Sequence, residues 1–229
     1  LYDQAILPWD DDIDIGMTRE NYNKFLKVAP GDLGPSYFLS WIETDPHTPY
    51  YFAKVKKNNT LFVEEMFKNV PMHPGIFVDI FPFDRIPDNK LLRKLQYDAA
   101  GFLKCCLMGK EIWMWKHFGK CEIEHPTDRG AFSCFLNKAV DVLFSKKTIY
   151  RMLVAVQSCF NSWNTKYFNN VMTTTDHVTG ESLRHLQPVP FAPLTVNAPD
   201  TLEGILRYNY PTLPRYPDHD TDKENNPNP

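Results

Sequence analysis

Alternating apolar and polar positions predict several strands in the first third of the chain. Residues 5–17 lead into a run in which isoleucine and aspartate alternate with a period of two. Two aromatic and β-branched runs, residues 36–44 and 49–57, flank a proline-containing turn and predict a pair of strands. Residues 60–65 predict a further strand, and residues 75–84 (GIFVDIFPFD) predict the strongest of all.

Helical patterns begin directly after the first strand. Thr18 is placed to cap a short amphipathic helix, which we expect to end at Pro30-Gly31. Residues 88–115 repeat apolar side chains at helical spacing. The apolar stripe comprises Leu91, Leu92, Leu95, Ala99, Phe102 and Leu103. Residues 131–163 predict more helix, in two segments that meet near Ser145.

The order of these elements predicts an α+β fold, with strands and helices mixed at first and helices dominating later. We expect a single domain over residues 1–216. It divides into a strand-rich core that carries the carboxylates, residues 1–87, and a mainly helical extension, residues 88–216, with a late strand at 166–174. Residues 217–229 are polar and rich in proline and asparagine, which predicts a disordered tail.

Composition excludes several classes of protein. The chain has 229 residues, with 25 basic against 28 acidic side chains, so a broad nucleic-acid-binding surface is not expected. Five cysteines without a CxxC pair argue against a disulfide framework and a zinc site. No apolar run reaches the length of a membrane-spanning helix.

The acidic stretch PWDDDIDI carries the first candidate chemistry. On a strand, Asp10, Asp12 and Asp14 share one face, while Ile13 and Ile15 project into the core from the other. Carboxylates so close together repel each other unless a cation lies between them. The stretch therefore predicts a divalent metal, Mg²⁺ or Mn²⁺.

Asp79 points to the same site from a second strand. It is the only charged residue within the apolar run IFVDIFPF, so we expect it to be buried on at least one side. A buried carboxylate must be paired, protonated or bound to metal. A D-x-D pair with a third carboxylate on a neighbouring strand describes a two-metal centre for phosphoryl transfer.

A solvated turn, a calcium-binding loop and an aspartate nucleophile motif each fit the acidic stretch less well. A solvated acidic turn leaves the flanking isoleucines and Asp79 unexplained. An EF-hand loop that starts at Asp10 would place Ile15 where glycine is required and Asn21 where a bidentate glutamate is required. A DxDxT nucleophile motif fails because Gly16 stands at the threonine position.

These stretches resemble a known family. ILPWDDDIDIGM, FAKVKKNNTLFVEE and HPGIFVDIFPFDRIPDNK are similar, in wording and order, to motifs of the LicD/fukutin-like phosphotransferases. LEGILRYNYPTLPRYPDHD resembles the family's looser C-terminal motif. The resemblance implies a core sheet of the DNA polymerase beta-like nucleotidyltransferase fold.

The resemblance also implies an activity. Bacterial members transfer phosphocholine or a related alcohol phosphate from a CDP-activated donor, with CDP-choline the first candidate here. The acceptor is a sugar hydroxyl of a cell-surface glycan or lipid-linked glycan, in lipopolysaccharide, teichoic acid or capsule. We expect a cytoplasmic enzyme without a transmembrane segment, working at the inner face of the membrane through peripheral contact of its helices.

The family's residues carry over by position. Asp12, Asp14 and Asp79 match the catalytic, metal-binding carboxylates, with Asp79 the candidate for deprotonating the acceptor hydroxyl. Asp10 is a further metal-binding candidate. The expected donor-phosphate-binding residues are Lys54, Lys57 and Thr60, and the expected supporting residues are Trp9, Asp11 and Asp84.

Two alternatives stay open at this point. Sugar-nucleotide glycosyltransferases also use a D-x-D pair to hold Mn²⁺ against a diphosphate, although they need no separate Asp79 strand. The family's glycine turn before the carboxylate strand is missing, because the chain begins at Leu1. We therefore expect a chain truncated at its N-terminus, and an inactive fragment with a role in glycan assembly is the second alternative.

Overall fold

The computed structural model describes residues 13–118, 139–140, 142–171, 177–191, 193–201 and 205 of the chain. Helices and strands mix along the described residues, which confirms the α+β class. The elements, in chain order, are β1 (Asp14–Thr18), α1 (Arg19–Asp32), β2 (Tyr37–Ser40), β3 (Ala53–Lys57), the 3₁₀ helix η1 (Glu65–Phe67), β4 (Phe77–Ile86), α2 (Lys90–Phe118), α4 (Lys146–Ser158), β5 (Tyr167–Asn169), β6 (Val178–Thr179), β7 (Leu186–Phe191) and β8 (Leu194–Pro199).

Strand β4 is the centre of a six-stranded sheet. The path runs β2-β3-β4-β5-β6 with antiparallel neighbours, and β1 pairs with β4 in parallel. Asp79 has register partners on both sides, in β1 and in β3, so these two strands flank β4. A central residue of β4 therefore faces a neighbour in each flanking strand.

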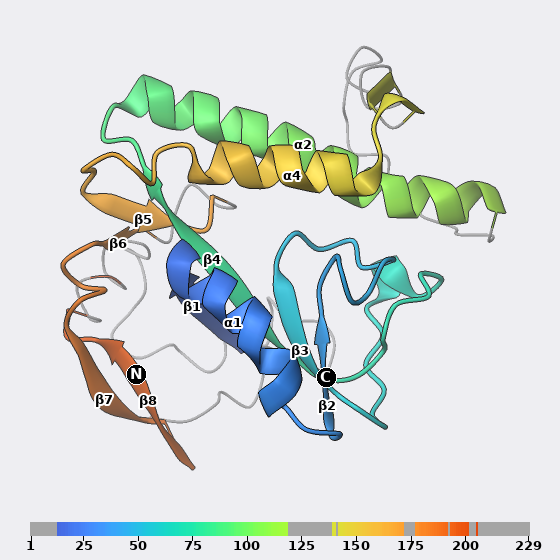
Figure 1. Ribbon diagram of the computed structural model, residues 1–229, viewed down its shortest axis with the longest axis horizontal. Coiled ribbons are helices and arrows are strands. Elements are labelled where there is room, and N and C mark those ends of the chain that lie inside the picture. The colour runs from blue at the N-terminus through green and yellow to red at the C-terminus, as the bar shows by residue number, and fades with distance from the viewer. Residues whose placement is uncertain are drawn as a thin grey trace, which may run out of the picture.

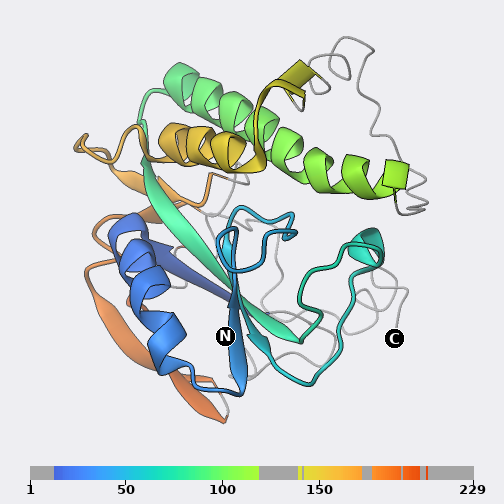
Figure 2. The ribbon, with the colours of Figure 1, turned by 45° about the vertical axis from the view of Figure 1, so that its right-hand side comes forward.

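Helix α1 covers one face of this sheet, and helices α2 and α4 pack side by side across the far end of β4 (Figures 1 and 2). Tyr22 and Ala29 of α1 pack on Leu39, Ala53 and Ile80 of three neighbouring strands. A second core joins the helix pair to the sheet end. Its buried members include Ala100, Leu103, Leu107, Ile149, Leu153 and Ile86.

Local capping explains where the helices begin. Thr18 accepts a hydrogen bond from the Asn21 amide at 3.5 Å, and Ser145 accepts one from the Thr148 amide at 3.2 Å. Asn89 accepts from the amides of Leu91 and Leu92 and so caps α2. The predicted boundary near Ser145 is confirmed. None of the helices in the described part of the chain combines the length and apolar character that crossing a bilayer requires.

The predicted end of α1 is wrong. The helix continues through Pro30 to Asp32, and the Leu33 amide still donates to the Ala29 carbonyl at 2.9 Å. Proline removes only its own amide bond, which costs little so near the last turn, where the helix is ending anyway.

The predicted burial of Ile15 is also wrong, because 41% of its surface is exposed. Within the described residues, β1 pairs with β4 alone and its outer side carries no further strand. Met17 of β1 packs against the core under α1, whereas Ile15 does not. Hydrogen bonds to β4 therefore hold β1 in place more than buried isoleucines do.

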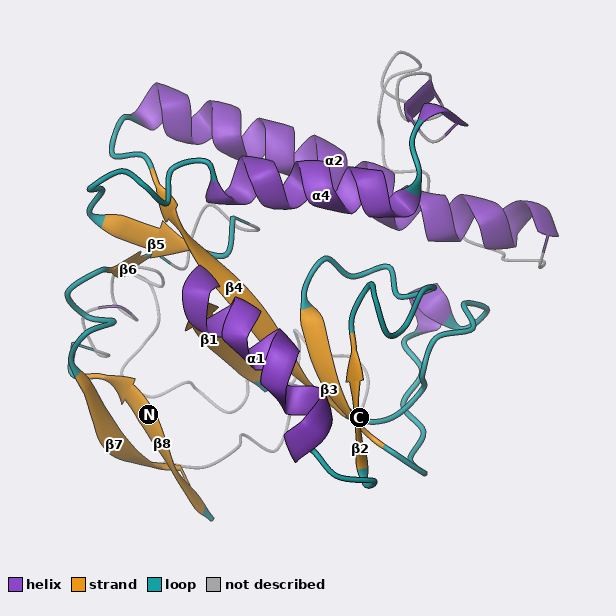
Figure 3. Cartoon of the chain, viewed as in Figure 1, coloured by secondary structure: helices purple, strands orange, loops and turns teal. Residues whose placement is uncertain are grey.

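The second half of the chain contains more strand than the expected helical extension over 88–216. Strand β5 confirms the late strand predicted at 166–174 and, with β6, extends the main sheet, while β7 and β8 form a separate two-stranded sheet (Figure 3). Residues 60–64, by contrast, form no strand and lead into η1. The short runs of β5–β8 alternate too few residues to show a clear period.

The buried stripe of α2 also differs from the predicted one. Leu91, Leu92 and Leu95 are exposed, although Leu103 of the expected stripe is buried. The buried positions at helical spacing are Gln96, Ala100, Leu103, Leu107 and Glu111, two of which are polar. Gln96 is buried because its side chain donates to the Gln157 carbonyl of α4 at 3.0 Å. Apolar periodicity alone therefore missed a helix face that is partly polar.

Gly75 tests the close packing at the entry to β4. A Cβ at this position would overlap the Lys57 carbonyl oxygen, a backbone atom that cannot rotate away. Gly75→Ala is expected to lower the free energy of unfolding by about 1–3 kcal/mol, measured by urea denaturation. Gly101→Ala is the matched control, since nothing lies within 4 Å of its added Cβ and α2 gains helix propensity there. Equal effects of the two substitutions would contradict the packing explanation.

Candidate active site

Three charged side chains lie side by side on the face of the sheet opposite α1. Asp79 of β4 is the register partner of Asp14 in β1 and of Lys54 in β3. The Asp79 amide also donates to the Ile13 carbonyl at 2.9 Å, which fixes the start of β1 against β4. Directly paired residues on neighbouring strands are about 4.8 Å apart and point to the same face. We call Asp14, Asp79 and Lys54 the charged row.

The two carboxylates of the charged row differ in exposure. Asp79 is buried, with 7% of its surface exposed, as its apolar run predicts, whereas Asp14 is exposed. Strand β4 has neighbours on both sides, while β1 is open on its outer side. The sheet therefore presents one carboxylate to solvent beside one held in the interior.

Lys54 neutralises part of the charge on Asp79. Its Nζ donates to Asp79 Oδ2 at 3.2 Å and lies 2.9 Å from Oδ1. Only 3% of the Lys54 side chain is exposed. The ammonium also lies 3.4 Å from the ring centre of Phe77 and 4.1 Å from that of Tyr50. Ring faces attract a cation, so the aromatic surroundings compensate for its lost hydration.

Glu64 adds a third carboxylate to this group. Its Oε2 lies 3.9 Å from Lys54 Nζ and accepts a hydrogen bond from the Tyr50 hydroxyl. Burial, together with the bond to Glu64, raises the pKa of Tyr50, so its hydroxyl stays protonated and donates. Tyr50 and Glu64 therefore contact the Lys54 ammonium in addition to Asp79 and help to hold it in place.

The pKa of Asp79 is raised to about 6 by its buried position and the charged groups around it. Burial is the largest cause, because it penalises the ionised form. Lys54 lowers the pKa, while Asp14 and Glu64 raise it. One ammonium does not offset burial and two neighbouring carboxylates, so an added cation would stabilise the ionised Asp79.

The site's chemistry fits a divalent cation. Asp79 Oδ1 is buried and accepts no hydrogen bond from the described residues, although the Lys54 ammonium is near it. Carboxylate oxygens are the ligands that Mg²⁺ and Mn²⁺ prefer. Asp10, Asp11, Asp12 and Trp9 lie outside the described residues. The rest of the described chain supplies no group of three or more metal-ligating side chains, which leaves Asp14 and Asp79 as a pair.

Of the three predicted donor-binding residues, the structure brings Lys54 to the carboxylates but neither Lys57 nor Thr60. The Lys54 ammonium already donates a hydrogen bond to Asp79. Lys57 is exposed and, by strand alternation, points to the opposite face of the sheet from Lys54. Thr60 uses its hydroxyl within a turn, donating to the Lys57 carbonyl at 2.7 Å and accepting from the Ile76 amide at 3.0 Å. Thr60 therefore shapes the chain between β3 and β4.

Lys56, rather than the predicted Lys57, lies on the same face of the sheet as the charged row. It is buried, and its ammonium donates to the His73 carbonyl. Burial lowers the pKa of Lys56 to about 8, with Lys54 adding to the effect and Asp45 opposing it. The spacing of two residues between Lys54 and Lys56 was the sequence signal that identifies it. Tyr50 and Glu64 lie outside regular strands, so strand alternation does not predict which way their side chains point.

Asp84, an expected supporting residue, belongs to the other face of the sheet. It is fully buried, and Arg19 donates hydrogen bonds to both of its carboxylate oxygens. Arg19 Nε donates to Oδ1 at 2.9 Å, and Nη2 donates to Oδ2. Asn161 donates to Oδ1 at 2.6 Å. This carboxylate ties α1 to β4 and to the segment after α4, and so supports the fold around the site.

Comparisons with known proteins relate the first part of the chain to one family. Residues 2–102 match the model of the family LicD/FKTN/FKRP, nucleotidyltransferase domain. The chain is also 27% identical over 150 residues to the lipopolysaccharide cholinephosphotransferase LicD of Haemophilus influenzae. That match covers 62% of this chain and 49% of the relative, so the chain spans about half of the relative's length.

No solved structure matches the chain. The matched segment contains the whole charged row, from Asp14 in β1 through Lys54 in β3 to Asp79 in β4. Residues 2–102 are therefore similar to the LicD/FKTN/FKRP nucleotidyltransferase domain, and the match includes every member of the charged row.

Proposed function

We propose that this protein is a metal-dependent phosphotransferase. It transfers phosphocholine, or a related alcohol phosphate, from a CDP-activated donor to a sugar hydroxyl of a cell-surface glycan, with lipopolysaccharide the first candidate acceptor. Teichoic acid and capsule are the other acceptor classes. The single observation that carries the proposal is the register pairing of Asp14 with Asp79, beside a lysine that holds Asp79 in position.

Asp14 and Asp79, with Asp12 and Asp10, would hold Mg²⁺ or Mn²⁺ within a nucleotidyltransferase core. When bound, the cation neutralises the donor diphosphate and acidifies the acceptor hydroxyl.

Asp79 accepts the proton of the acceptor hydroxyl. Lys54 keeps this carboxylate in one orientation, and Tyr50 and Glu64 keep Lys54 in turn. Without a cation the pKa of Asp79 is raised to about 6, mainly by burial, and a bound cation would favour the ionised carboxylate that takes up the proton. The leaving group is CMP, and the donor's phosphoryl group is left as a phosphodiester on the sugar.

The geometry favours phosphoryl transfer over sugar-nucleotide glycosyl transfer. A glycosyltransferase needs its D-x-D pair only to hold a metal against the diphosphate. Here a second strand contributes a buried carboxylate that faces the first, with its own lysine partner. Phosphoryl transfer needs both a metal and a base close to the attacking hydroxyl oxygen, and two carboxylates on adjacent strands can supply both.

The proposal predicts CMP release from CDP-choline that depends on Mg²⁺ or Mn²⁺ and on a glycan acceptor. The purified protein would be incubated with each CDP-alcohol and with lipopolysaccharide lacking choline, and CMP would be quantified by chromatography. Lys57→Gln serves as a control, because Lys57 points away from the charged row, and it is expected to retain activity within about threefold of the unaltered protein.

Two outcomes would contradict the proposal. One is consumption of UDP-sugars with no release of CMP from any CDP-alcohol, which would indicate a glycosyltransferase. The other is CMP release that persists in EDTA, which would remove the metal from the mechanism.

A further inference from the structure

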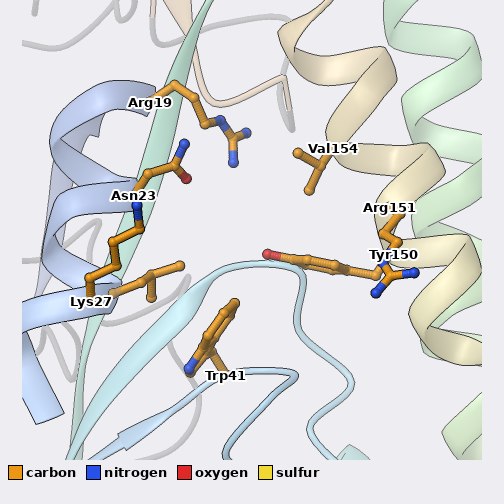
Figure 4. A pocket seen from close by; sticks show the side chains of 8 residues that line it. Arg19, Asn23, Lys27, Trp41, Tyr150, Arg151 and Val154 are labelled. Carbon is orange, nitrogen blue, oxygen red and sulfur yellow. The ribbon is translucent and has the colours of Figure 1, made fainter.

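A cavity of about 370 Å³ lies between α1, α4 and the turn that follows β2 (Figure 4). Arg19 and Lys27 line it from α1, Tyr150 and Arg151 line it from α4, and Trp41 lies below them. Arg19 and Tyr150 project into the space from opposite sides. Its volume is within the range of pockets that bind small molecules.

This cavity is separate from the charged row. Ile80, on the face of β4 opposite to Asp79, packs under α1, the helix that lines the cavity. The carboxylates and the cavity therefore lie on opposite faces of the sheet. A ligand in the cavity would make no contact with Asp14 or Asp79.

The lining carries excess positive charge. Asp84 already neutralises Arg19. Lys27 and Arg151 form no ion pair with any residue that the structure describes, and both are exposed at the rim. The acid nearest in the chain to Trp41 is Glu43, which pairs with Lys147 at 2.6 Å. Lys27 and Arg151 lie on opposite sides of the cavity (Figure 4), and each is a cation that can attract an anion.

The walls between these cations are aromatic. Trp41 and Tyr150 are partly buried, and each packs against the core of the helix pair, which fixes the position of its ring. Burial raises the pKa of Tyr150, and its hydroxyl therefore remains a hydrogen-bond donor. Rigid aromatic rings offer a face on which a base or sugar ring can stack.

We propose that this cavity binds a small ligand in which a ring carries a phosphate group, with Lys27 or Arg151 holding the phosphate and Trp41 and Tyr150 contacting the ring. Nucleotides and sugar phosphates share this chemistry. The site adds a second binding function to the protein, distinct from the carboxylate centre and independent of the proposed transferase activity.

The test measures binding to the full chain by isothermal titration calorimetry. The probes are CMP, glucose 1-phosphate and inorganic phosphate, with cytidine and glucose as neutral counterparts. At least one ring-bearing phosphate should bind more tightly than inorganic phosphate and than its neutral counterpart. The double variant K27Q/R151Q should weaken that binding about tenfold, since the charge-assisted contact to the phosphate is lost whichever of the two cations makes it.

Matched variants locate the binding. K24Q/K90Q removes the same net charge from exposed positions outside the cavity and should preserve the affinity. Asp14→Asn, which alters the charged row across the sheet, should also preserve it. The proposal is overturned if no ring-bearing phosphate binds, or if K27Q/R151Q binds as tightly as K24Q/K90Q. Loss of binding in Asp14→Asn would assign the ligand to the carboxylate centre instead. Whether CMP or glucose 1-phosphate binds more tightly identifies the source of the phosphate.

Discussion

Asp84→Ala is expected to lower the free energy of unfolding by about 3–5 kcal/mol. The substitution removes the only ion-pair partner that the described residues provide for Arg19, whose side chain is 11% exposed. It also strips Asn161 of an acceptor at 2.6 Å and opens a space under α1. Breaking one side of a buried pair leaves an uncompensated charge, which explains the large effect. Urea denaturation followed by circular dichroism measures it.

Asp98→Ala is the matched control for this experiment. Asp98 also pairs with a basic side chain, Lys94, at 2.5 Å, but the two side chains are 60% and 70% exposed. Water screens such a pair, so its loss is expected to cost about 0.5 kcal/mol or less. If Asp84→Ala costs no more than Asp98→Ala, Asp84 does not join α1 to the sheet as the structure indicates.

Asp79→Asn is expected to reduce CMP release by about a thousandfold or more, because the amide is neither a base nor a strong metal ligand. The amide has the same shape as the carboxylate, and its oxygen can still accept from Lys54, so the fold should be retained. Steady-state rates with CDP-choline at saturating Mg²⁺ measure the effect, and a denaturation curve checks the fold.

The size of the residual rate distinguishes a catalytic role from a structural one. A folded Asp79→Asn protein that keeps more than a tenth of the activity would show that Asp79 neither accepts the proton nor holds the metal. Asp14→Asn should lose activity as well. Asp14 is exposed, so its loss should weaken metal affinity with little effect on stability.

The sequence alone determined the α+β class and the carboxylates of the site. Apolar and polar residues alternate with a period of two around Asp14, and Asp79 is a single charge within an apolar run. Each pattern predicts a strand from local sequence alone. Thr18 and Ser145 marked helix starts for an equally local reason, since a cap needs only the next three residues. Such features depend on neighbours in the chain.

Only the tertiary structure decided which of these residues meet. The register that places Asp79 between Asp14 and Lys54 arises from the pairing of three strands, and no local pattern encodes it. The same pairing assigns Lys56 rather than Lys57 to the charged face, exposes Ile15 at the sheet edge, and gives Asp84 to Arg19. Burial and charge compensation depend on neighbours that are far apart in sequence. The sequence pattern therefore identified the carboxylates, and the pairing of strands in the sheet determined which residues contact them.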